Sequence, residues 1–434
     1  MSWNSLLWPR QLRAGNKHRR FQGLSRRMRE LRMPKPQLNG ACARESAMTD
    51  TYTLYGMAAS LYTARVRSYM RINAVPFTEV KAGSEEFLGQ IVPAIGRWMI
   101  PVIKTPDGAI IQDGADIIDH LDSQGFSKHP LYPDQPALLV IAHLFELFGA
   151  QGLLRPAMHY RWNFDDVNLP FIRDTFRDVL PTGLPPEAEE KAFLQASGRM
   201  RAATLALGAK EDVHAQIEHS YARFLALMNT HLDRYPFLLG GHPTLADYGL
   251  IGAMYAHLGR DPAPLQLMQT TAPRVFRWVE RMNMAETFVD GAQAESGHEL
   301  FEGTALPDSL VALLGFIAED YLPEINAHIE FANAWLDNHP IQADINAANQ
   351  ETARPAMGFA SFTWRETQID SVVIPYRFYL LHRLQDAFDR QSANDQAAIR
   401  ETFAAAGLEP LLTKRTKRRL VRKDSQEIWG YMVG

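Results

Sequence analysis

The stretch Thr53–Val80, TLYGMAASLYTARVRSYMRINAVPFTEV, has the pattern of a strand, a loop, a helix and a second strand. A short apolar run ends at Gly56, and small residues follow as far as Ser60. From Tyr62 onward the apolar side chains recur at helical spacing. The segment Asn73–Pro76 ends the helix, and the residues after it alternate as in a strand. The sequence therefore predicts a β-α-β unit.

Ser60 lies between the first strand and the helix. The first turn of a helix presents unpaired N–H groups and the positive end of the helix dipole. A thiolate or carboxylate placed there is stabilised, and a serine hydroxyl adds one directed hydrogen bond. Serine is also a favoured N-cap, so Ser60 taken alone is first interpreted as a cap.

The length and composition narrow the class of protein. A chain of 434 residues has room for two or three domains. Its most apolar run, Ala137–Ala150, contains His143 and Glu146, so we expect no membrane span. The single cysteine, Cys42, lies outside the part expected to fold, which excludes a disulfide framework and a cysteine nucleophile there. Without an HExxH motif or a tight His/Asp cluster, we expect no metal.

The net charge of −4 conceals an asymmetry. Residues 1–47 carry 11 Lys or Arg against two acids, which leaves the rest of the chain acidic and argues against nucleic-acid binding. They lack the apolar core of a secretory signal. A disordered basic extension, a non-native start before Met48 and an organelle transit peptide all remain open. We expect a cytoplasmic protein and exclude this segment from the fold.

Residues 50–124 complete the first predicted domain. The run RWMIPVI predicts a strand in which Pro101 holds Ile100 extended. A TPDG turn and a further short strand follow. Asp113-Gly114 then opens a helix. Residues 125–135 form a linker that contains Pro and Gly, and the chain after them is helical almost throughout.

A second signal is the sequence GGHPTLADYGLIGAMYAHL, in which Thr244 and Asp247 form a capping box before an apolar run. Together with SLYTARVRSYM, IPVI and QDGADIIDHLD, this order of motifs resembles the glutathione transferase superfamily. PRVFRWVERM, Pro273–Met282, resembles the helix that follows in that family. The resemblance covers Thr53–Met282. It implies an α/β thioredoxin-like N-terminal domain followed by a larger all-α domain.

Two parts of the chain depart from this resemblance. The all-helical domain, residues 136–297, contains an insertion at 163–213. Residues 298–434 lie beyond the usual end of the family's chain and are expected to form a helical C-terminal extension. They include a basic run, Lys414–Lys423, which is most simply interpreted as a solvated tail.

The resemblance implies a glutathione site on the first domain. It places Ser60 at the hydroxyl that donates to the glutathione sulfur and favours the thiolate. Tyr55 and Tyr62 are alternatives, because other classes use a tyrosine near the end of the first strand. The backbone of Ile100, before Pro101, would pair with the cysteinyl part of glutathione.

The helix start at Asp113-Gly114 differs from the family pattern of an acid followed by serine. The N–H of Gly114 would still face the γ-glutamyl carboxylate, but the serine hydroxyl is missing. Asp113 would take the γ-glutamyl ammonium. One lost neutral hydrogen bond weakens binding by about 1 kcal/mol. Asp113 is equally interpreted as an N-cap without a ligand.

The first long helix of the second domain ends in a cluster that would face an electrophile. Arg155 and His159 are spaced i,i+4 and share a face if the helix continues through Pro156. With Tyr160 and Trp162 they would form a cationic, aromatic pocket. The alternative is a surface helix end, where Arg and His complement the dipole.

Two functions follow from the resemblance. The first is a detoxification-type transferase that activates the glutathione thiol for attack on a small electrophile. The second is a non-catalytic protein that uses the same scaffold for binding. The resemblance also implies a homodimer. From the acidic charge of the folded part and the lack of a long uncharged apolar run, we expect neither a nucleic acid nor a membrane as partner.

Overall fold

The computed structural model describes most of the chain, namely residues 51–181, 183–285, 297, 299–302, 306–339, 345–346 and 356–432. The predicted basic extension, residues 1–47 with Cys42, lies outside the described residues.

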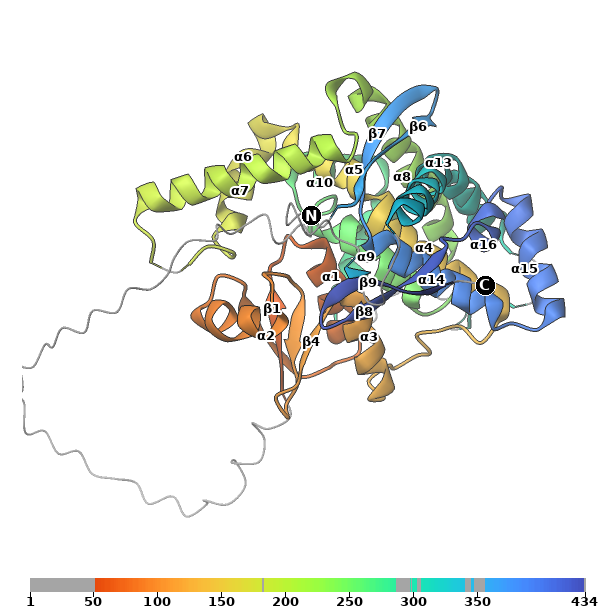
Figure 1. Ribbon diagram of the computed structural model, residues 1–434, viewed down its shortest axis with the longest axis horizontal. Coiled ribbons are helices and arrows are strands. Elements are labelled where there is room, and N and C mark those ends of the chain that lie inside the picture. Colours follow the sequence, from red (N-terminus) through yellow and green to blue (C-terminus); the bar gives the residue numbers. More distant parts are fainter. Residues whose placement is uncertain are drawn as a thin grey trace, which may run out of the picture.

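The first domain is built on a four-stranded mixed sheet with the strand order β2-β1-β3-β4 (Figure 1). Its elements are β1 (Tyr52–Gly56), α1 (Leu61–Ile72), β2 (Phe77–Lys81), η1 (Phe87–Ile91), α2 (Val92–Ile95), β3 (Val102–Lys104), β4 (Ile110–Gln112) and α3 (Gly114–Ser123). Strand β1 pairs in parallel with β2 and antiparallel with β3, and β4 is antiparallel to β3. The predicted order of a β-α-β unit, a hairpin and a helix is confirmed.

The second domain is helical. Its elements are α4 (Pro136–Leu147), η2 (Phe148–Gly152), α5 (Leu154–Trp162), α6 (Asp165–Phe176), α7 (Pro186–Ala206), η3 (Glu211–Val213), α8 (His214–Arg234), α9 (Leu245–Ala256), α10 (Pro262–Thr271) and α11 (Pro273–Arg281). The segment 163–213 contains α6, α7 and η3, and Figure 1 shows α7 reaching out from the body of the molecule.

The continuous helical stretch Pro136–Trp162 is long and apolar enough, by length and composition alone, to cross a membrane. Of its most apolar window, however, 89% is buried inside the protein, as in a core helix. Helix α9 approaches it so closely that only glycine fits at the crossing. A Cβ on Gly149 would lie 2.5 Å from the carbonyl oxygen of Gly249, and a Cβ on Gly249 would lie 2.4 Å from Cα of Glu146.

The predicted capping box at the start of α9 is present. The backbone N–H of Thr244 donates to Oδ2 of Asp247 at 3.1 Å. The other carboxylate oxygen, Oδ1, accepts from the backbone N–H of Leu238 and from the indole N–H of Trp278, both at 3.0 Å. Asp247 is fully buried. Its carboxylate therefore links the start of α9 to the preceding turn and to α11.

Replacing Asp247 with asparagine should lower the free energy of unfolding by about 1–3 kcal/mol, because the amide NH₂ would face N–H donors on one side. Urea denaturation measures the change. The matched control is Asp233→Asn, an exposed acid that pairs with Arg274 on the surface, for which we expect a change within about 0.5 kcal/mol. Equal effects of the two changes would contradict a structural role for the buried carboxylate.

The C-terminal segment was predicted to be helical, but it contains strands as well as helices. It contains α13 (Asp308–Asn338), β5 (Ile345–Asn346), β6 (Gly358–Trp364), β7 (Thr367–Val373), α14 (Tyr376–Asp389), α15 (Ala393–Ala405), α16 (Pro410–Thr413), β8 (Arg418–Lys423) and β9 (Gln426–Met432). Strands β6 and β7 form a hairpin, and β5, β9 and β8 form a small sheet. Burial alternates along β6, which is the period of a strand with one buried face.

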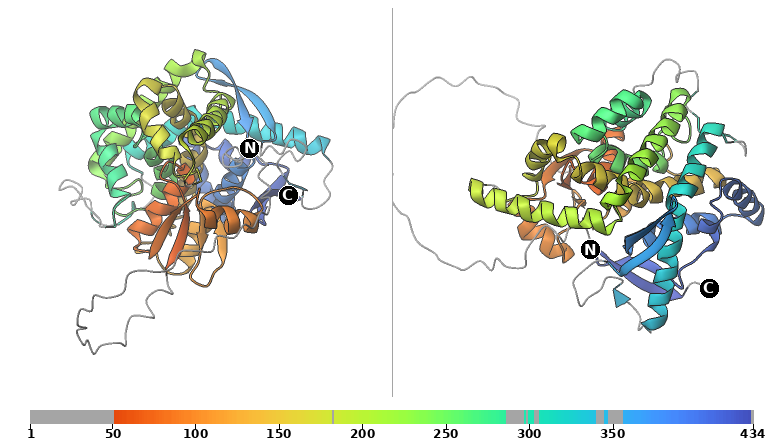
Figure 2. Two further views of the ribbon diagram at one scale, coloured as in Figure 1. Left: turned by 90° about the vertical axis from the view of Figure 1, so that its left-hand side faces the viewer. Right: turned by 90° about the horizontal axis from the view of Figure 1, so that it is seen from above.

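The basic run Lys414–Lys423 is not a solvated tail. Most of it forms β8, which pairs with β9, and Leu420 is buried. Figures 1 and 2 show this hairpin and α14 lying against the N-terminal domain and α4. On α14, Tyr379 donates to Asp116 of α3 at 2.6 Å. The C-terminal segment is therefore packed onto α3 and α4.

Candidate functional site at the start of helix α1

Ser60 is the N-cap of α1, as the sequence predicts. Its backbone is extended, and its side-chain oxygen accepts a hydrogen bond from the N–H of Thr63 at 3.2 Å. Among the described residues, the Ser60 hydroxyl has no acceptor for its own proton. The hydroxyl can therefore donate to a ligand while it caps the helix.

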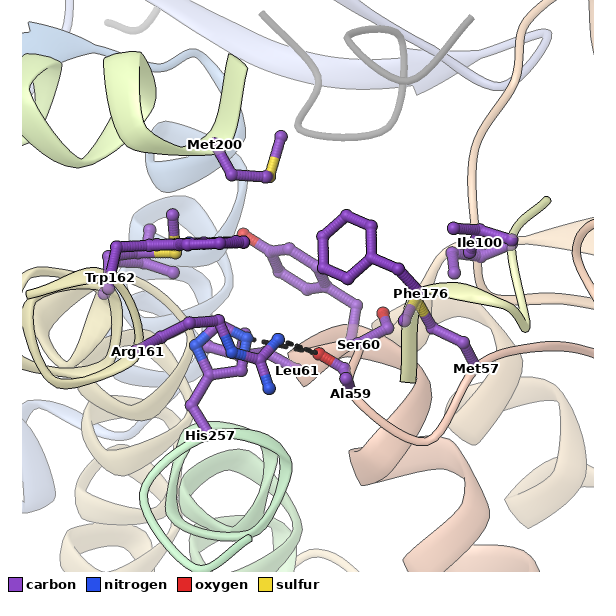
Figure 3. Close-up of a pocket in the computed structure, with 14 residues that line it drawn as sticks. Met57, Ala59, Ser60, Leu61, Ile100, Arg161, Trp162, Phe176, Met200 and His257 are labelled. Carbon is purple, nitrogen blue, oxygen red and sulfur yellow. Dashed lines mark hydrogen bonds between the residues drawn. The ribbon is translucent and has the colours of Figure 1, made fainter. Parts of the chain in front are cut away.

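Ser60 borders a cavity of about 80 Å³ between the two domains. Apolar side chains from α5 and from the segment 163–213 form most of the wall: Leu154, Met158, Trp162, Phe176, Val179 and Met200. Figure 3 shows Phe176 and Met200 on one side of the cavity and Arg161 and His257 on the other.

Arg161 and His257 hold the loop before Ser60. Both contact the carbonyl oxygen of Ala59, Arg161 through Nη1 at 3.4 Å and His257 through Nε2 at 3.2 Å. Arg161 also forms a buried, two-bond ion pair with Asp261. Burial and the charge of Arg161 lower the pKa of His257 well below its usual range. These two side chains therefore position the loop, and neither is available to take a proton from a ligand.

The two alternative tyrosines lie in different places. Tyr55 is fully buried against Phe87 and does not line the cavity. Tyr62 lines the cavity, and its hydroxyl accepts from Nε2 of Gln151 at 3.2 Å. Burial raises the pKa of Tyr62 to about 12, so its phenol stays protonated at neutral pH.

Ile100 also lines the cavity, and its peptide bond to Pro101 is cis. The carbonyl oxygen of Pro101 accepts from the N–H of Asp113 at 3.3 Å. This contact joins the strand β3 to the start of α3. Ser60 follows β1, Ile100 and Pro101 precede β3, and Asp113 follows β4, so the strand pairing places all four residues at one end of the sheet.

Asp113 has a strained backbone, with φ +103° and ψ 142°, a region that non-glycine residues rarely adopt. Its Oδ1 accepts from the N–H of Ala115 at 2.9 Å, so it is an N-cap. The same oxygen accepts from the hydroxyl of Tyr376 at 3.0 Å. One oxygen of this carboxylate, Oδ1, is thus bound within the chain, and the other, Oδ2, lies 3.9 Å from Nη1 of Arg422.

The side chain of Arg65 lies close to Gly114 and leaves little room for a side chain at that position. A Cβ at this position would lie 3.0 Å from Cδ of Arg65. Arg65 is fully buried and forms an ion pair with Glu146 at 2.6 Å. The space in which the family's serine would sit is therefore occupied by the stem of this arginine.

The predicted electrophile residues separate in the structure. Trp162 lines the cavity, whereas Arg155, His159 and Tyr160 do not. Arg155 pairs with Glu324 of α13. His159 contacts Glu218 at 3.0 Å, and burial lowers the pKa of His159 to about 4.

The cavity-facing side of α5 is shifted by one residue from the predicted one. The spacing i, i+4, i+7 relates the cavity-lining residues Leu154, Met158 and Arg161. It is as regular as the i, i+4 spacing of Arg155 and His159. Pro156 lies in the first turn of the helix, where it does not break it. The spacing therefore predicts both faces of α5, but it does not predict which of the two faces lies against the cavity. His257, at the end of α9, carries no sequence signal for this position.

Two family models match the chain. The model described as the glutathione S-transferase N-terminal domain matches residues 54–129, and the one described as the C-terminal domain matches residues 184–286. No match was found among curated proteins. Among the groups of His, Cys, Asp and Glu in the described part of the chain, none is arranged to hold a metal ion.

Solved structures give distant likenesses. Glutathione transferase GSTFuA3 from Phanerochaete chrysosporium is 16% identical over 56% of this chain and 99% of its own, with a TM-score of 0.39. Beta-etherase LigF from Sphingobium sp. strain SYK-6 is 16% identical over 56% and 98%, with a TM-score of 0.37. A glutathione transferase family member from Pseudomonas fluorescens pf-5, solved with two glutathione bound, is 14% identical over 54% and 89%, with a TM-score of 0.33.

These structural likenesses are too distant to carry a function. The two family models match in the order in which the motifs occur, the first over the Ser60 helix and Pro101 and the second over the capping box of α9. Residues 54–129 and 184–286 of this chain are therefore the N-terminal and C-terminal domains of the glutathione S-transferase superfamily.

Proposed function

We propose that this protein holds a thiol at Ser60 as its thiolate and presents it to a small electrophile in the adjoining apolar cavity. The observation that carries the proposal is the Ser60 hydroxyl. It caps α1 through its oxygen, borders the cavity and has its proton available for a ligand. Superfamily membership supports transferase chemistry at this position.

The local electrostatics support a thiolate. The N-terminus of α1 contributes about 0.3–1 kcal/mol toward a negative charge. A hydrogen bond from the hydroxyl to a charged sulfur contributes about 1.5–3 kcal/mol. Each 1.4 kcal/mol lowers the thiol pKa by about one unit. The thiol proton passes to solvent, the sulfur forms a bond to the electrophilic carbon, and the leaving group departs with its electron pair.

The test is displacement of chloride from 4-nitrobenzyl chloride, with either N-acetylcysteinylglycine or glutathione as the thiol. Replacing Ser60 with alanine should lower kcat/KM by roughly 10–100-fold, because one hydrogen bond to the thiolate is lost. Ser60→Thr, which keeps a hydroxyl, should retain most of the rate.

Ser60→Asp separates the cap from the chemistry. Its carboxylate can still accept from Thr63, so stability should be restored relative to Ser60→Ala. Its negative charge repels a thiolate, so the rate should stay low. If the wild type is no faster than Ser60→Ala with both thiols, the proposal is wrong.

One contact favours a second candidate, a binding protein without catalysis. The hydrogen bond from Tyr376 reaches Oδ1 of Asp113, a carboxylate that the family resemblance assigns to a ligand. On this alternative, small molecules bind the cavity, but no thiol reacts faster there than in solution. The chloride-displacement assay distinguishes the two candidates.

A further inference from the structure

We infer that the C-terminal segment of this chain fills the place of a γ-glutamyl group, so that the thiol used at Ser60 is one without a γ-glutamyl arm. Tyr376 is the residue that sets this specificity. The inference rests on the proposed function and names the class of thiol that fits it.

Tyr376 lies between the cavity and the start of α3. Its ring packs edge-on against Tyr62, with the ring centroids 5.8 Å apart. Its hydroxyl reaches Asp113. Tyr62 lines the cavity, and Tyr376 is buried. A ligand that extended from Ser60 to Asp113 would have to displace this ring.

A second side chain, that of Arg422, closes the space beside Asp113 at the start of α3. Nε of Arg422 donates to Asp116 at 2.9 Å, Nη1 to Glu427 at 2.6 Å, and Nη2 to the side-chain oxygen of Gln112. Its Nη1 also lies 3.9 Å from Asp113. Because four of the five guanidinium N–H donors already have partners within the chain, Arg422 acts as an anchor for this hairpin.

The third side is closed by Arg65, whose stem lies beside Gly114. The residues around the start of α3 therefore fit glutathione poorly: Oδ1 of Asp113 is bound within the chain and its Oδ2 faces Arg422, the serine hydroxyl is absent, and its space is filled. Ion pairs hold α14, the helix that carries Tyr376, against α3 and α4. Arg383, one helical turn beyond Tyr379, pairs with Asp119 at 2.6 Å and with Glu146 at 3.1 Å.

The cavity beside Ser60 is separate from this closed place and remains lined by apolar side chains. A thiol with a short or acylated amino group can reach Ser60 from the cavity side. The chemical class is therefore a cysteine-type thiol without the γ-glutamyl arm, such as an N-acylated cysteine or cysteinylglycine.

The direct test uses the full wild-type chain and two thiols that differ only at this arm, glutathione and N-acetylcysteinylglycine. With rates corrected for the uncatalysed reaction of each thiol, the acetyl compound should have a kcat/KM at least about tenfold higher, because the γ-glutamyl arm of glutathione would have to displace the Tyr376 ring. An equal or higher kcat/KM for glutathione would overturn the inference and leave the proposed function standing.

Two variants locate the cause. Tyr376→Ala removes the ring and should raise kcat/KM for glutathione by about tenfold while leaving that for N-acetylcysteinylglycine within about twofold. Tyr376→Phe keeps the ring and should keep the preference of the wild type. If Tyr376→Ala does not fold, the wild-type comparison of the two thiols decides alone. If neither thiol depends on Ser60, the proposed function fails first.

Discussion

Replacing Glu324 with glutamine should lower the free energy of unfolding by about 3–5 kcal/mol, because two buried arginines lose their shared counter-charge. Glu324 pairs with Arg155 of α5 and with Arg377 of α14, the latter at 2.7 Å. Burial alone would raise the pKa of Glu324, but these two guanidinium groups outweigh it and hold the pKa far below its usual range.

The remaining hydrogen bonds of this cluster show that no other group can replace the lost charge. Arg377 donates to Nδ1 of His328, whose Nε2 lies 2.8 Å from Ser371, and Ser371 donates to Glu324 at 3.0 Å. Burial and Arg377 lower the pKa of His328 well below its usual range, so the imidazole is neutral. Glu324 is thus the anion that both arginines share.

Equilibrium urea unfolding measures the effect. The matched control is Glu319→Gln on the same helix. Glu319 pairs with Arg223 on the surface, and such pairs contribute only about 0–1 kcal/mol. If Glu324→Gln and Glu319→Gln cost the same, the buried cluster does not hold the C-terminal segment to α5.

Replacing Glu146 with glutamine should cost a similar 3–5 kcal/mol and should also change the acid stability of the protein. Glu146 is fully buried on α4 and receives Arg65 from α1 and Arg383 from α14. Burial would raise the pKa of Glu146, but Arg383 and Arg65 hold it well below its ordinary value of 4.5.

The sign of the pH effect follows from that lowered pKa. The unfolded chain binds the proton at a higher pH than the folded protein does. The stability contributed by Glu146 is therefore fully present above the ordinary pKa of 4.5 and is lost as the pH falls through the folded-state pKa. The difference in unfolding free energy between the wild type and Glu146→Gln should shrink as the pH is lowered below this value.

Asp119→Asn is the control for this experiment. Asp119 pairs with the same Arg383 but at the partly exposed edge of the cluster, so its loss should cost about 0–1 kcal/mol. If the difference in unfolding free energy between the wild type and Glu146→Gln did not depend on pH, the carboxylate charge would not be what stabilises the contact of Glu146 with Arg65 and Arg383.

The N-terminal domain could be predicted because its signals are local. The apolar run before Gly56, the cap at Ser60 and the turn before Pro76 each specify a short element. The capping box of Thr244 and Asp247 is local in the same way. The sheet order adds only short-range pairing, since every pair of neighbouring strands joins segments of this one domain.

The cavity was predicted only in part. Three residues that the sequence singled out, Ser60, Ile100 and Trp162, line the cavity, but α5 has two faces with equally regular spacing. Which face meets the cavity is decided by α13, since Arg155 finds its counter-charge there. The choice depends on packing between distant elements and has no local signature.

The position of the C-terminal segment was not predictable in this way. Tyr376 and Asp113 are 263 residues apart, and Arg422 and Gln112 are 310 residues apart. The basic run at Lys414–Lys423 therefore suggested a solvated tail, because the acids that Arg422 meets belong to α3 and to its own hairpin. Charge pattern alone does not distinguish a tail from a strand with distant partners.

We propose that the Ser60 hydroxyl stabilises a bound thiolate. The most direct measurement is the pKa of N-acetylcysteinylglycine bound to the full chain, followed by thiolate absorbance against pH in the wild type and in Ser60→Ala. A free thiol has a pKa of about 8.5. We expect the bound thiol to have a pKa lower by roughly 1–3 units in the wild type, and most of that shift to be lost in Ser60→Ala. Equal pKa values in the two proteins would contradict it.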